Sequence, residues 1–123
     1  MTIVLAHQSA IPIYEQIKEQ LKASILSGAL AEGELLPSIR QLARELQVSV
    51  ITTTRAYNDL ELEGFIQTAP GKGCYVKKLE AERIKEKYLA ETKEALRTAL
   101  RLGRLAGLSP EAMHNLLSEV QST

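Results

Sequence analysis

The chain has 123 residues, which suffices for about one domain with a helical extension but not for two separate cores. Its 15 Lys and Arg residues balance 15 Asp and Glu residues, which excludes a global attraction to nucleic acid, so any such function depends on how the charges are distributed. The single cysteine, Cys74, excludes an internal disulfide, and neither a signal peptide nor a run of roughly 20 apolar residues is recognisable, so we expect a cytoplasmic protein without a membrane partner.

The first helix is expected to begin at Pro12. Apolar residues follow at intervals of four until Gly28 stops the pattern, namely Ile13, Ile17, Leu21 and Ile25. Residues 1–10 form an apolar N-terminal arm that is too short to classify, and a strand, an ordered arm and a disordered tag all stay open. The segment from Gly28 to Pro37 has two glycines and a proline, which predicts a turn-rich loop.

A second, shorter helix is expected to begin after Ser38. Ser38 and Gln41 have the spacing of a capping box, in which each side chain satisfies the backbone N–H of the other residue. Arg40 and Arg44 lie four residues apart on the exposed side of this helix. Such a pair is commonly a solvated surface, but its place directly before the next helix favours contact with DNA phosphates.

The stretch from Gln47 to Leu60 is predicted to be a helix that reads DNA. Ser49 is a good N-cap, and the apolar residues after it recur with helical spacing until Gly64. The run from Val50 to Thr54 is β-branched throughout and favours a strand by propensity alone. The helical spacing of the apolar residues nevertheless favours a helix over a strand.

The side chains of this helix suit a DNA surface. The hydroxyls of Thr52 and Thr54 and the guanidinium of Arg55 surround its positive N-terminal end, and no acidic residue occurs between positions 47 and 58. A tight corner at residues 47–48 joins it to the helix before, so the two are expected to form a helix-turn-helix.

A β-hairpin is expected to follow. Two β-prone runs, 65–68 and 74–76, flank a turn that carries Gly71, Lys72 and Gly73. A hairpin after the second helix of such a unit is a wing, and glycines on both sides of Lys72 let its backbone come close to DNA. An ordinary charged turn is the alternative interpretation.

From Leu79 the composition changes to that of a long helix, which Gly103 and Gly107 are expected to break. Ser109, with Pro110 after it, predicts the start of a last helix. Each helix carries an apolar face that we expect to form a dimer interface. The residues of that interface are Ile84, Tyr88, Leu96, Leu100, Met113, Leu116, Leu117 and Val120. Folding of both helices back onto the same protomer is the alternative.

The sequence offers no convincing catalytic set, so we do not expect an enzyme. The two histidines, His7 and His114, have no partners at ligand spacing, and no metal or cofactor is expected. The Pro-Gly-Lys-Gly run leads into no helix and is therefore not a nucleotide-binding loop. No convergent set of polar residues marks an effector pocket, so the sequence does not indicate whether a small molecule binds.

Several runs of residues resemble the winged-helix domain of GntR-type bacterial transcription regulators, and the similarity covers residues 11–78 without a gap. These runs are 12–17 (Pro-Ile-Tyr-Glu-Gln-Ile), 36–43 (Leu-Pro-Ser-Ile-Arg-Gln-Leu-Ala), 48–49, 55–57, 60–61, 63–66 and 71–73 with Val76. Only two helices follow the wing, and this resembles the short YtrA-like subfamily. The resemblance implies a two-helix tail that makes a homodimer, and a function as a repressor.

The resemblance also implies roles for individual positions. Arg40 and Arg55 match family arginines, Ser49 and Thr52 match hydroxyl positions at the start of the recognition helix, and 71–73 matches the wing tip. There are three departures from the family pattern. Val50-Ile51 stands where the family commonly has an arginine, or the short subfamily a Pro-Asn pair, and Thr54 stands where many relatives have another arginine. Ala69-Pro70 replaces the basic residues often found before the wing glycines. We therefore expect methyl contacts to thymine and threonine hydroxyls to contribute to the readout.

Together these observations predict a mainly α-helical chain with a small β-hairpin, organised as an arm (1–10), a winged helix-turn-helix domain (11–78) and a helical dimerisation region (79–123). The expected partners are an inverted-repeat operator in double-stranded DNA and a second copy of the chain. The predicted DNA-binding residues are Ser38, Arg40, Arg44, Ser49, Val50, Ile51, Thr52, Thr54, Arg55, Gly71, Lys72 and Gly73. A winged-helix module that binds another protein is the alternative function.

Overall fold

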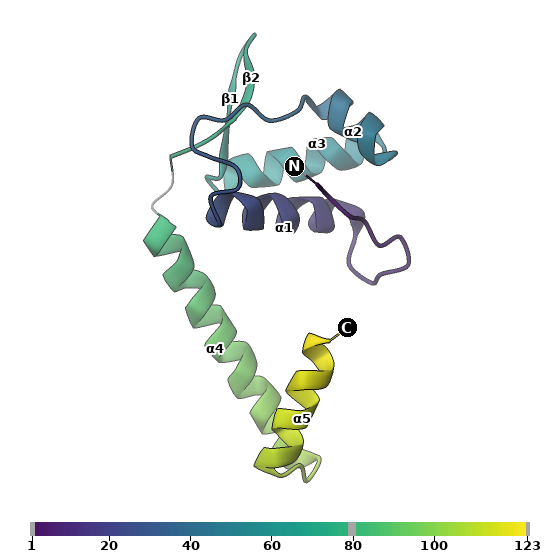
Figure 1. Ribbon diagram of the computed structural model, residues 1–123, viewed down its shortest axis with the longest axis vertical. Coiled ribbons are helices and arrows are strands. Elements are labelled where there is room, and N and C mark those ends of the chain that lie inside the picture. Colours follow the sequence, from purple (N-terminus) through teal and green to yellow (C-terminus); the bar gives the residue numbers. More distant parts are fainter. Residues whose placement is uncertain (1, 79–80, 123) are drawn as a thin grey trace. The chain divides into compact units, whose positions relative to one another are not determined.

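A computed structural model describes residues 2–78 and 81–122 in two compact units, Met1–Glu80 and Ala81–Thr123 (Figure 1). The first unit contains three helices and a two-stranded antiparallel sheet, and the second contains two helices. The elements are α1 (Ile13–Leu26), α2 (Ile39–Leu46), α3 (Val50–Leu62), β1 (Ile66–Ala69), β2 (Gly73–Val76), α4 (Ala81–Leu105) and α5 (Pro110–Gln121). The predicted fold class, a winged helix-turn-helix followed by two helices, is confirmed.

The core of the first unit lies where α1 and α2 pack against α3. Ile17 and Leu21 of α1, Leu42 of α2, Leu60 of α3 and Ile66 of β1 are all at most 1% exposed. The buried apolar residues of α1, Ile17, Leu21 and Ile25, recur every four residues, so this amphipathic helix turns its apolar face inward. The unit thus completes a hydrophobic core of its own.

Serine caps fix the starts of α2 and α3. Ser38 Oγ accepts a hydrogen bond from the Gln41 N–H at 3.0 Å, and Ser49 Oγ accepts one from the Thr52 N–H at 3.0 Å. Only half of the predicted capping box forms, because the Gln41 amide donates to Glu45 Oε1 at 3.2 Å rather than pairing with Ser38. The helical assignment of residues 50–62 is confirmed, so burial of its apolar face outweighs the β-propensity of its first turns.

The corner between α2 and α3 is built on Gln47. Gln47 has φ 56°, and it is the only non-glycine residue with positive φ in the part of the chain that the structure describes. Its left-handed conformation ends α2, and its N–H donates to the carbonyl of Arg44 at 3.3 Å. The chain therefore turns within three residues and starts α3 beside α2, as the predicted helix-turn-helix requires.

The wing is the antiparallel pair β1 and β2, in register from Ile66 opposite Val76 to Ala69 opposite Gly73. The Lys72 N–H donates to the Ala69 carbonyl at 2.9 Å and closes the turn. Gly71 and Gly73 have φ 77° and 103°, values that residues with a side chain rarely adopt. The predicted hairpin is confirmed.

The loop before α2 adds a further extended segment to this sheet. Leu35 forms an antiparallel bridge with Tyr75, the Leu36 N–H donates to the Cys74 carbonyl at 2.8 Å, and the Val76 N–H donates to the Glu34 carbonyl at 3.0 Å. The sequence predicted only a turn-rich loop here. The pairing anchors the wing to the segment that leads into α2.

The N-terminal arm, which the sequence left open, is held against α1 by two glutamine side chains. The Gln20 amide exchanges two hydrogen bonds with the backbone of Val4, at 3.0 and 2.7 Å. The Gln16 amide does the same with Ala6, at 2.8 and 2.9 Å, and also donates to the Ile11 carbonyl. Side-chain amides thus substitute for a neighbouring strand, and residues 2–11 form an ordered arm.

In the second unit α4 continues through Gly103, so the predicted break at this residue is wrong. A Cβ at Gly103 would meet Sδ of Met113, so the missing side chain leaves room for Met113 of α5 inside a continuous helix. The chain turns after Leu105, where Gly107 adopts φ 76°. Leu79, the predicted start of the long helix, lies outside the described residues.

The predicted start of α5 is confirmed. Ser109 Oγ accepts a hydrogen bond from the Ala112 N–H at 3.1 Å, Pro110 occupies the first helical position, and Glu111 lies in the first turn. Within residues 2–78 and 81–122, no helix combines the length and apolar character needed to cross a bilayer.

Candidate nucleic-acid interface

The outward face of α3 differs from its buried face in a way that suits contact with DNA bases. Thr53, Ala56, Tyr57 and Leu60 point into the core. On the other side Ile51 is 82% exposed, although it is a large apolar residue in the first turn. Val50 is exposed next to it. Exposed methyl groups at the start of a recognition helix are the groups that contact the C5-methyl of thymine.

The hydroxyls at the start of α3 are largely engaged within the helix. Ser49 Oγ accepts from the Thr52 N–H and donates to Thr52 Oγ1 at 2.8 Å, so its proton is used. Thr54 Oγ1 donates to the Val50 carbonyl at 2.7 Å and can only accept from a base. Thr52 accepts from Ser49 and keeps its own proton for a ligand. Of the three predicted hydroxyls, Ser49 thus caps the helix, Thr54 can accept a hydrogen bond from a base, and Thr52 can donate one.

Two arginines border the N-terminal end of α3. Arg40 and Arg44 line a surface hollow together with Gln47, Val48 and Val50. Both arginines are exposed, and neither makes an ion pair with any residue that the structure describes. Ser38 caps α2 two residues before Arg40, and its hydroxyl accepts from the Gln41 N–H. This end of the domain carries two exposed arginines without an ion pair among the described residues.

The wing supplies a further cation. Lys72 is exposed at the tip between Gly71 and Gly73, and its carbonyl accepts a hydrogen bond from the Tyr75 hydroxyl at 3.2 Å. The tyrosine therefore fixes the turn while the lysine side chain stays at the surface. β1 contacts α3, so the wing belongs to the same unit as the recognition helix.

Arg55 lies on the exposed side of α3 in contact with α1. Its guanidinium carbon is 3.7 Å from the centre of the Tyr14 ring, which is the geometry of a cation–π stack. The sequence suggested Arg55 as a DNA contact but did not identify Tyr14 as its neighbour. A stack of this kind covers one face of the guanidinium and leaves the N–H groups at its edge available.

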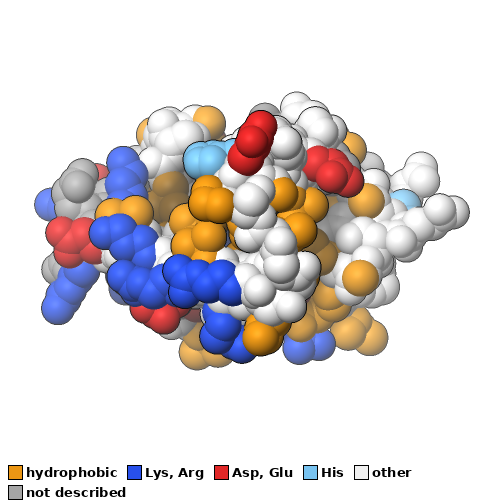
Figure 2. Space-filling view, turned by 90° about the horizontal axis from the view of Figure 1, so that it is seen from below, with side chains coloured by type: hydrophobic (Ala, Val, Ile, Leu, Met, Phe, Trp, Pro, Cys, Tyr) orange, Lys and Arg blue, Asp and Glu red, His pale blue; other side chains and the backbone are white. Residues whose placement is uncertain are grey.

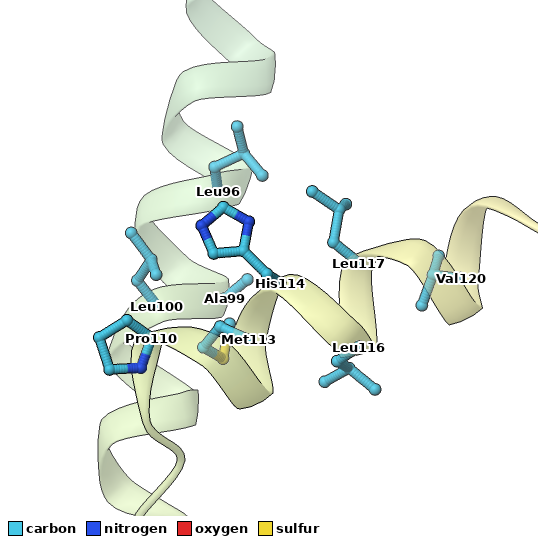
Figure 3. A pocket seen from close by; sticks show the side chains of 9 residues that line it. All are labelled: Leu96, Ala99, Leu100, Pro110, Met113, His114, Leu116, Leu117 and Val120. Carbon is cyan, nitrogen blue, oxygen red and sulfur yellow. The ribbon is translucent and has the colours of Figure 1, made fainter.

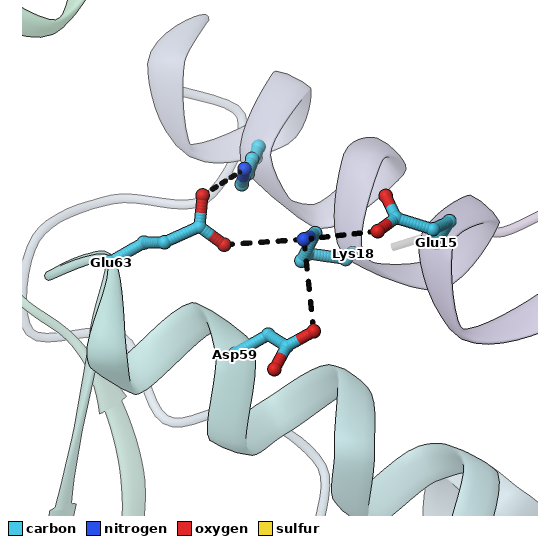
Figure 4. Close-up of polar contacts among 5 residues, drawn as sticks. Glu15, Lys18, Asp59 and Glu63 are labelled. Carbon is cyan, nitrogen blue, oxygen red and sulfur yellow. Dashed lines mark hydrogen bonds and ion pairs between the residues drawn. The ribbon is translucent and has the colours of Figure 1, made fainter.

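Near the other end of α3, the carboxylates of Asp59 and Glu63 pair with lysines of α1 (Figure 4). Lys18 Nζ is 3.3 Å from Glu15, 3.7 Å from Asp59 and 3.3 Å from Glu63, and Lys22 Nζ is 2.6 Å from Glu63. Figure 4 shows α1 presenting Lys18 between the carboxylates. These ion pairs join α1 to the C-terminal end of α3.

The pKa values of this cluster reflect the pairing. For Glu63, burial disfavours the charged form, but hydrogen bonds from Lys22 and Lys18 outweigh it and lower the pKa. For Lys18, burial likewise opposes the charged form, and the bonds to Glu15 and Glu63 raise the pKa. Hydrogen bonding from the Thr68 side chain and from its backbone N–H, which lies 2.7 Å from Glu61 Oε2, lowers the pKa of Glu61 and joins the end of α3 to β1. All three groups are thus held in their charged forms.

Asn58 is a residue that the sequence did not single out as a DNA contact. It is exposed on α3, one turn after Thr54 and two turns after Ile51. A side-chain amide at this place can both donate to and accept from an adenine edge. The spacing of Ile51, Thr54 and Asn58 along one helix face was the signal in the sequence.

The second unit presents an apolar groove of about 400 Å³ between α4 and α5 (Figure 3). Six of the eight predicted interface residues line it, namely Leu96, Leu100, Met113, Leu116, Leu117 and Val120. Four of these, the leucines, are between 42% and 47% exposed. Ile84 and Tyr88 are half-buried and lie outside this lining. Figure 2 shows hydrophobic side chains at the surface beside a row of Lys and Arg side chains.

Neither histidine lies in a metal-binding cluster. Among residues 2–78 and 81–122, no three His, Cys, Asp or Glu side chains are placed to hold a metal ion together. His114 lies in the wall of the apolar groove beside Leu96 (Figure 3). His7 lies in the exposed N-terminal arm.

Comparisons with known proteins agree with this geometry. The family model of bacterial regulatory proteins of the gntR family matches residues 13–76. The HTH-type transcriptional repressor YtrA of Bacillus subtilis is 34% identical over 115 residues, which cover 94% of this chain and 88% of YtrA. The match to YtrA thus extends beyond the winged helix into α4 and α5.

Solved structures are similar as well. The crystal structure of a transcriptional antiterminator from Listeria monocytogenes is 33% identical, with a TM-score of 0.74, and the match covers 98% of this chain and 90% of that one. The structure of AraR(DBD) in complex with operator ORR3 is 26% identical, with a TM-score of 0.52, and covers 62% of this chain and 92% of that chain. The winged helix, the two helices after it and the extent of these matches lead to one conclusion: the chain belongs to the gntR family of bacterial regulatory proteins.

Proposed function

We propose that this chain is a homodimeric transcription regulator, acting as a repressor in the cytoplasm, that binds an inverted-repeat operator in double-stranded DNA. The observation that carries the proposal is the unpaired positive charge around the start of α3, where Arg40 and Arg44 flank exposed Val50 and Ile51. The ion pairs of Asp59 and Glu63 with lysines of α1 support it, because they neutralise two carboxylates of the domain that would otherwise repel an anion.

Each side chain takes a role that follows from its chemistry. Val50 and Ile51 contact thymine methyl groups in the major groove, and Thr52, Thr54 and Asn58 contribute hydrogen bonds there. Arg40, Arg44 and Lys72 hold phosphates, which set the register without reading sequence. Ser38 and Ser49 keep the helix ends formed, so their free N–H groups point at the DNA backbone. Gly71 and Gly73 let the wing approach closely.

The dimer forms through the tail in this proposal. In this proposal residues 11–78 form the DNA-binding domain, and residues 79–123 form the dimerisation region. The groove between α4 and α5 is the contact surface of the dimer. Half-exposed leucines such as Leu96, Leu100 and Leu117 support it, because a contiguous apolar surface of this kind is costly to leave in water. Two-fold symmetry then places the two recognition helices on half-sites about 10 bp, or a multiple of this, apart.

A module that binds another protein through the winged helix is the competing function. Zero net charge and the apolar pair at positions 50 and 51 are compatible with it. That function does not explain why Arg40 and Arg44 make no ion pair among the described residues while Asp59 and Glu63 are paired with lysines. The DNA-binding proposal accounts for this difference.

Selection of bound duplexes from a random DNA pool at about 0.15 M salt tests the proposal, because this salt suppresses non-specific phosphate attraction. We expect recovery of an inverted repeat. A pool that stays unenriched both with the protein alone and after addition of cell extract, as a source of effector, would contradict a regulator that reads DNA.

A further inference from the structure

The seam between α1 and α3 includes three side-chain contacts, each four residues further along both helices. Tyr14 contacts Arg55, Lys18 contacts Asp59, and Lys22 contacts Glu63. Residues four apart on a helix lie on the same face, so the three contacts form one row. Two of the three are ion pairs between a lysine of α1 and a carboxylate of α3.

The first contact of the row, at the N-terminal end of both helices, has a different chemistry. Here the cation belongs to α3, and its partner on α1 is the Tyr14 ring, 3.7 Å from the Arg55 guanidinium carbon. A carboxylate would neutralise the arginine, whereas an aromatic face attracts it and leaves its net charge intact. Arg55 makes no ion pair with any described residue. The contact therefore orients a cation without cancelling it.

The stack also determines which part of α3 the guanidinium occupies. Ile51 and Asn58 are exposed on the outward side of the helix. Contact with Tyr14 draws Arg55 from that side toward α1, to the edge of the helix. In a duplex that admits α3 into its major groove, bases face the outward side and the sugar–phosphate backbone borders the edges.

We infer that Tyr14 is a positioning residue that holds Arg55 as a clamp for a DNA backbone phosphate at the edge between α1 and α3. This inference rests on the proposed function and specifies one of its contacts. Stacking on the Tyr14 ring restricts rotation of the guanidinium. Two N–H groups at the edge of the guanidinium can then donate to two oxygens of one phosphate. Arg55 then contributes affinity for any sequence and does not read a base.

Binding of the full chain to the selected operator and to point-substituted operators, titrated across salt concentrations, tests this inference. We expect Arg55→Gln to weaken binding to all these duplexes about ten-fold, with the slope of log affinity against log salt smaller by about 0.9, the value for one phosphate. Tyr14→Leu weakens binding in the same uniform way, whereas Tyr14→Phe, which keeps the ring, binds like the wild type. In the Arg55→Gln background, Tyr14→Leu has no further effect, because it acts through Arg55.

Other outcomes overturn the inference. A loss confined to one or two base pairs, with an unchanged salt slope, makes Arg55 a base reader. Full additivity of the Tyr14 and Arg55 substitutions, in variants that unfold at the wild-type temperature, gives Tyr14 a separate role. In both cases the wild type still enriches an operator and the proposed function stands, whereas a wild type that binds no duplex removes the function and the clamp together.

Discussion

The two units of the chain bury the apolar faces of their helices to different extents. In the first unit Ile17, Leu21 and Leu60 are 0% exposed. In the second, Leu96 is 47% exposed and Leu117 is 46% exposed, although both lie on the apolar face of a well-formed helix. One unit closes a core around itself, and the other presents an apolar groove that only another surface can cover. This difference supports the proposal that the tail associates with a second copy of the chain while the winged helix folds by itself.

Truncation of one leucine in each unit gives the largest effect. We expect Leu60→Ala to lower the free energy of unfolding by about 2–5 kcal/mol at any protein concentration, because it opens a cavity in a closed core. Leu96→Ala should lower stability only at concentrations where the dimer is populated, since the proposed dimer covers its side chain. Urea unfolding at two widely separated concentrations measures both. A concentration-independent loss for Leu96→Ala would show that the tail completes its core within one protomer.

A charge in the groove should affect assembly and leave folding of the winged helix intact. Leu117→Glu is expected to raise the dissociation constant of the dimer by about 100-fold, because a carboxylate is costly to bury at an apolar seam. Leu105→Glu is the matched control, since Leu105 is 77% exposed and does not line the groove. Sedimentation equilibrium distinguishes the two variants. Equal effects of both would place the seam elsewhere.

The charge distribution within the first unit provides the next test. Arg40→Ala should weaken binding to all duplexes by about ten-fold and reduce the salt slope by about 0.9, because one phosphate contact is lost. Titration by fluorescence anisotropy at several salt concentrations gives the slope. An unchanged slope would exclude Arg40 from the phosphate contacts. Gln41→Ala is a suitable control on the same exposed side of α2.

The paired acids should have the smallest effect, and it should depend on pH. The pKa of Glu63 is lowered in the folded state, so its contribution to stability is present above the unfolded value of about 4.3 and is lost as the pH falls through the lower folded value. Because Glu63 is 35% exposed, we expect Glu63→Gln to cost less than about 1 kcal/mol at neutral pH. Thermal unfolding between about pH 3 and 7 measures this. Glu19→Gln, at an exposed position of α1, should leave the profile unchanged.

Local signals in the sequence were sufficient for the helix starts. Ser38, Ser49 and Ser109 each cap the helix that the pattern assigned to them, because an N-cap acts on N–H groups only two or three residues away. The turn of the wing was equally local, since Gly71 and Gly73 carry the required backbone conformation themselves.

Contacts between distant residues were not predictable in the same way. Gly103 costs helix stability by propensity, which favoured a break, but α4 continues through it, and Met113 of α5 packs where a Cβ would lie. The pairing of Leu35 with Tyr75 and the stack of Arg55 on Tyr14 join segments far apart in the chain, and no spacing rule indicates them. The candidate DNA surface was thus largely identified by residue type, whereas the orientation of its side chains required the structure.

The proposed roles of the two units, DNA binding by the first and dimerisation by the second, can be tested directly with the selected operator and with one isolated half-site. Binding of the wild type and of Leu117→Glu to both duplexes would be measured at about 0.15 M salt. We expect both proteins to bind the half-site equally, and only the wild type to gain affinity on the full repeat, because only it presents two recognition helices at once. Equal affinity of both proteins for the full repeat would contradict the account, since the tail would then not be what joins the two DNA-binding domains.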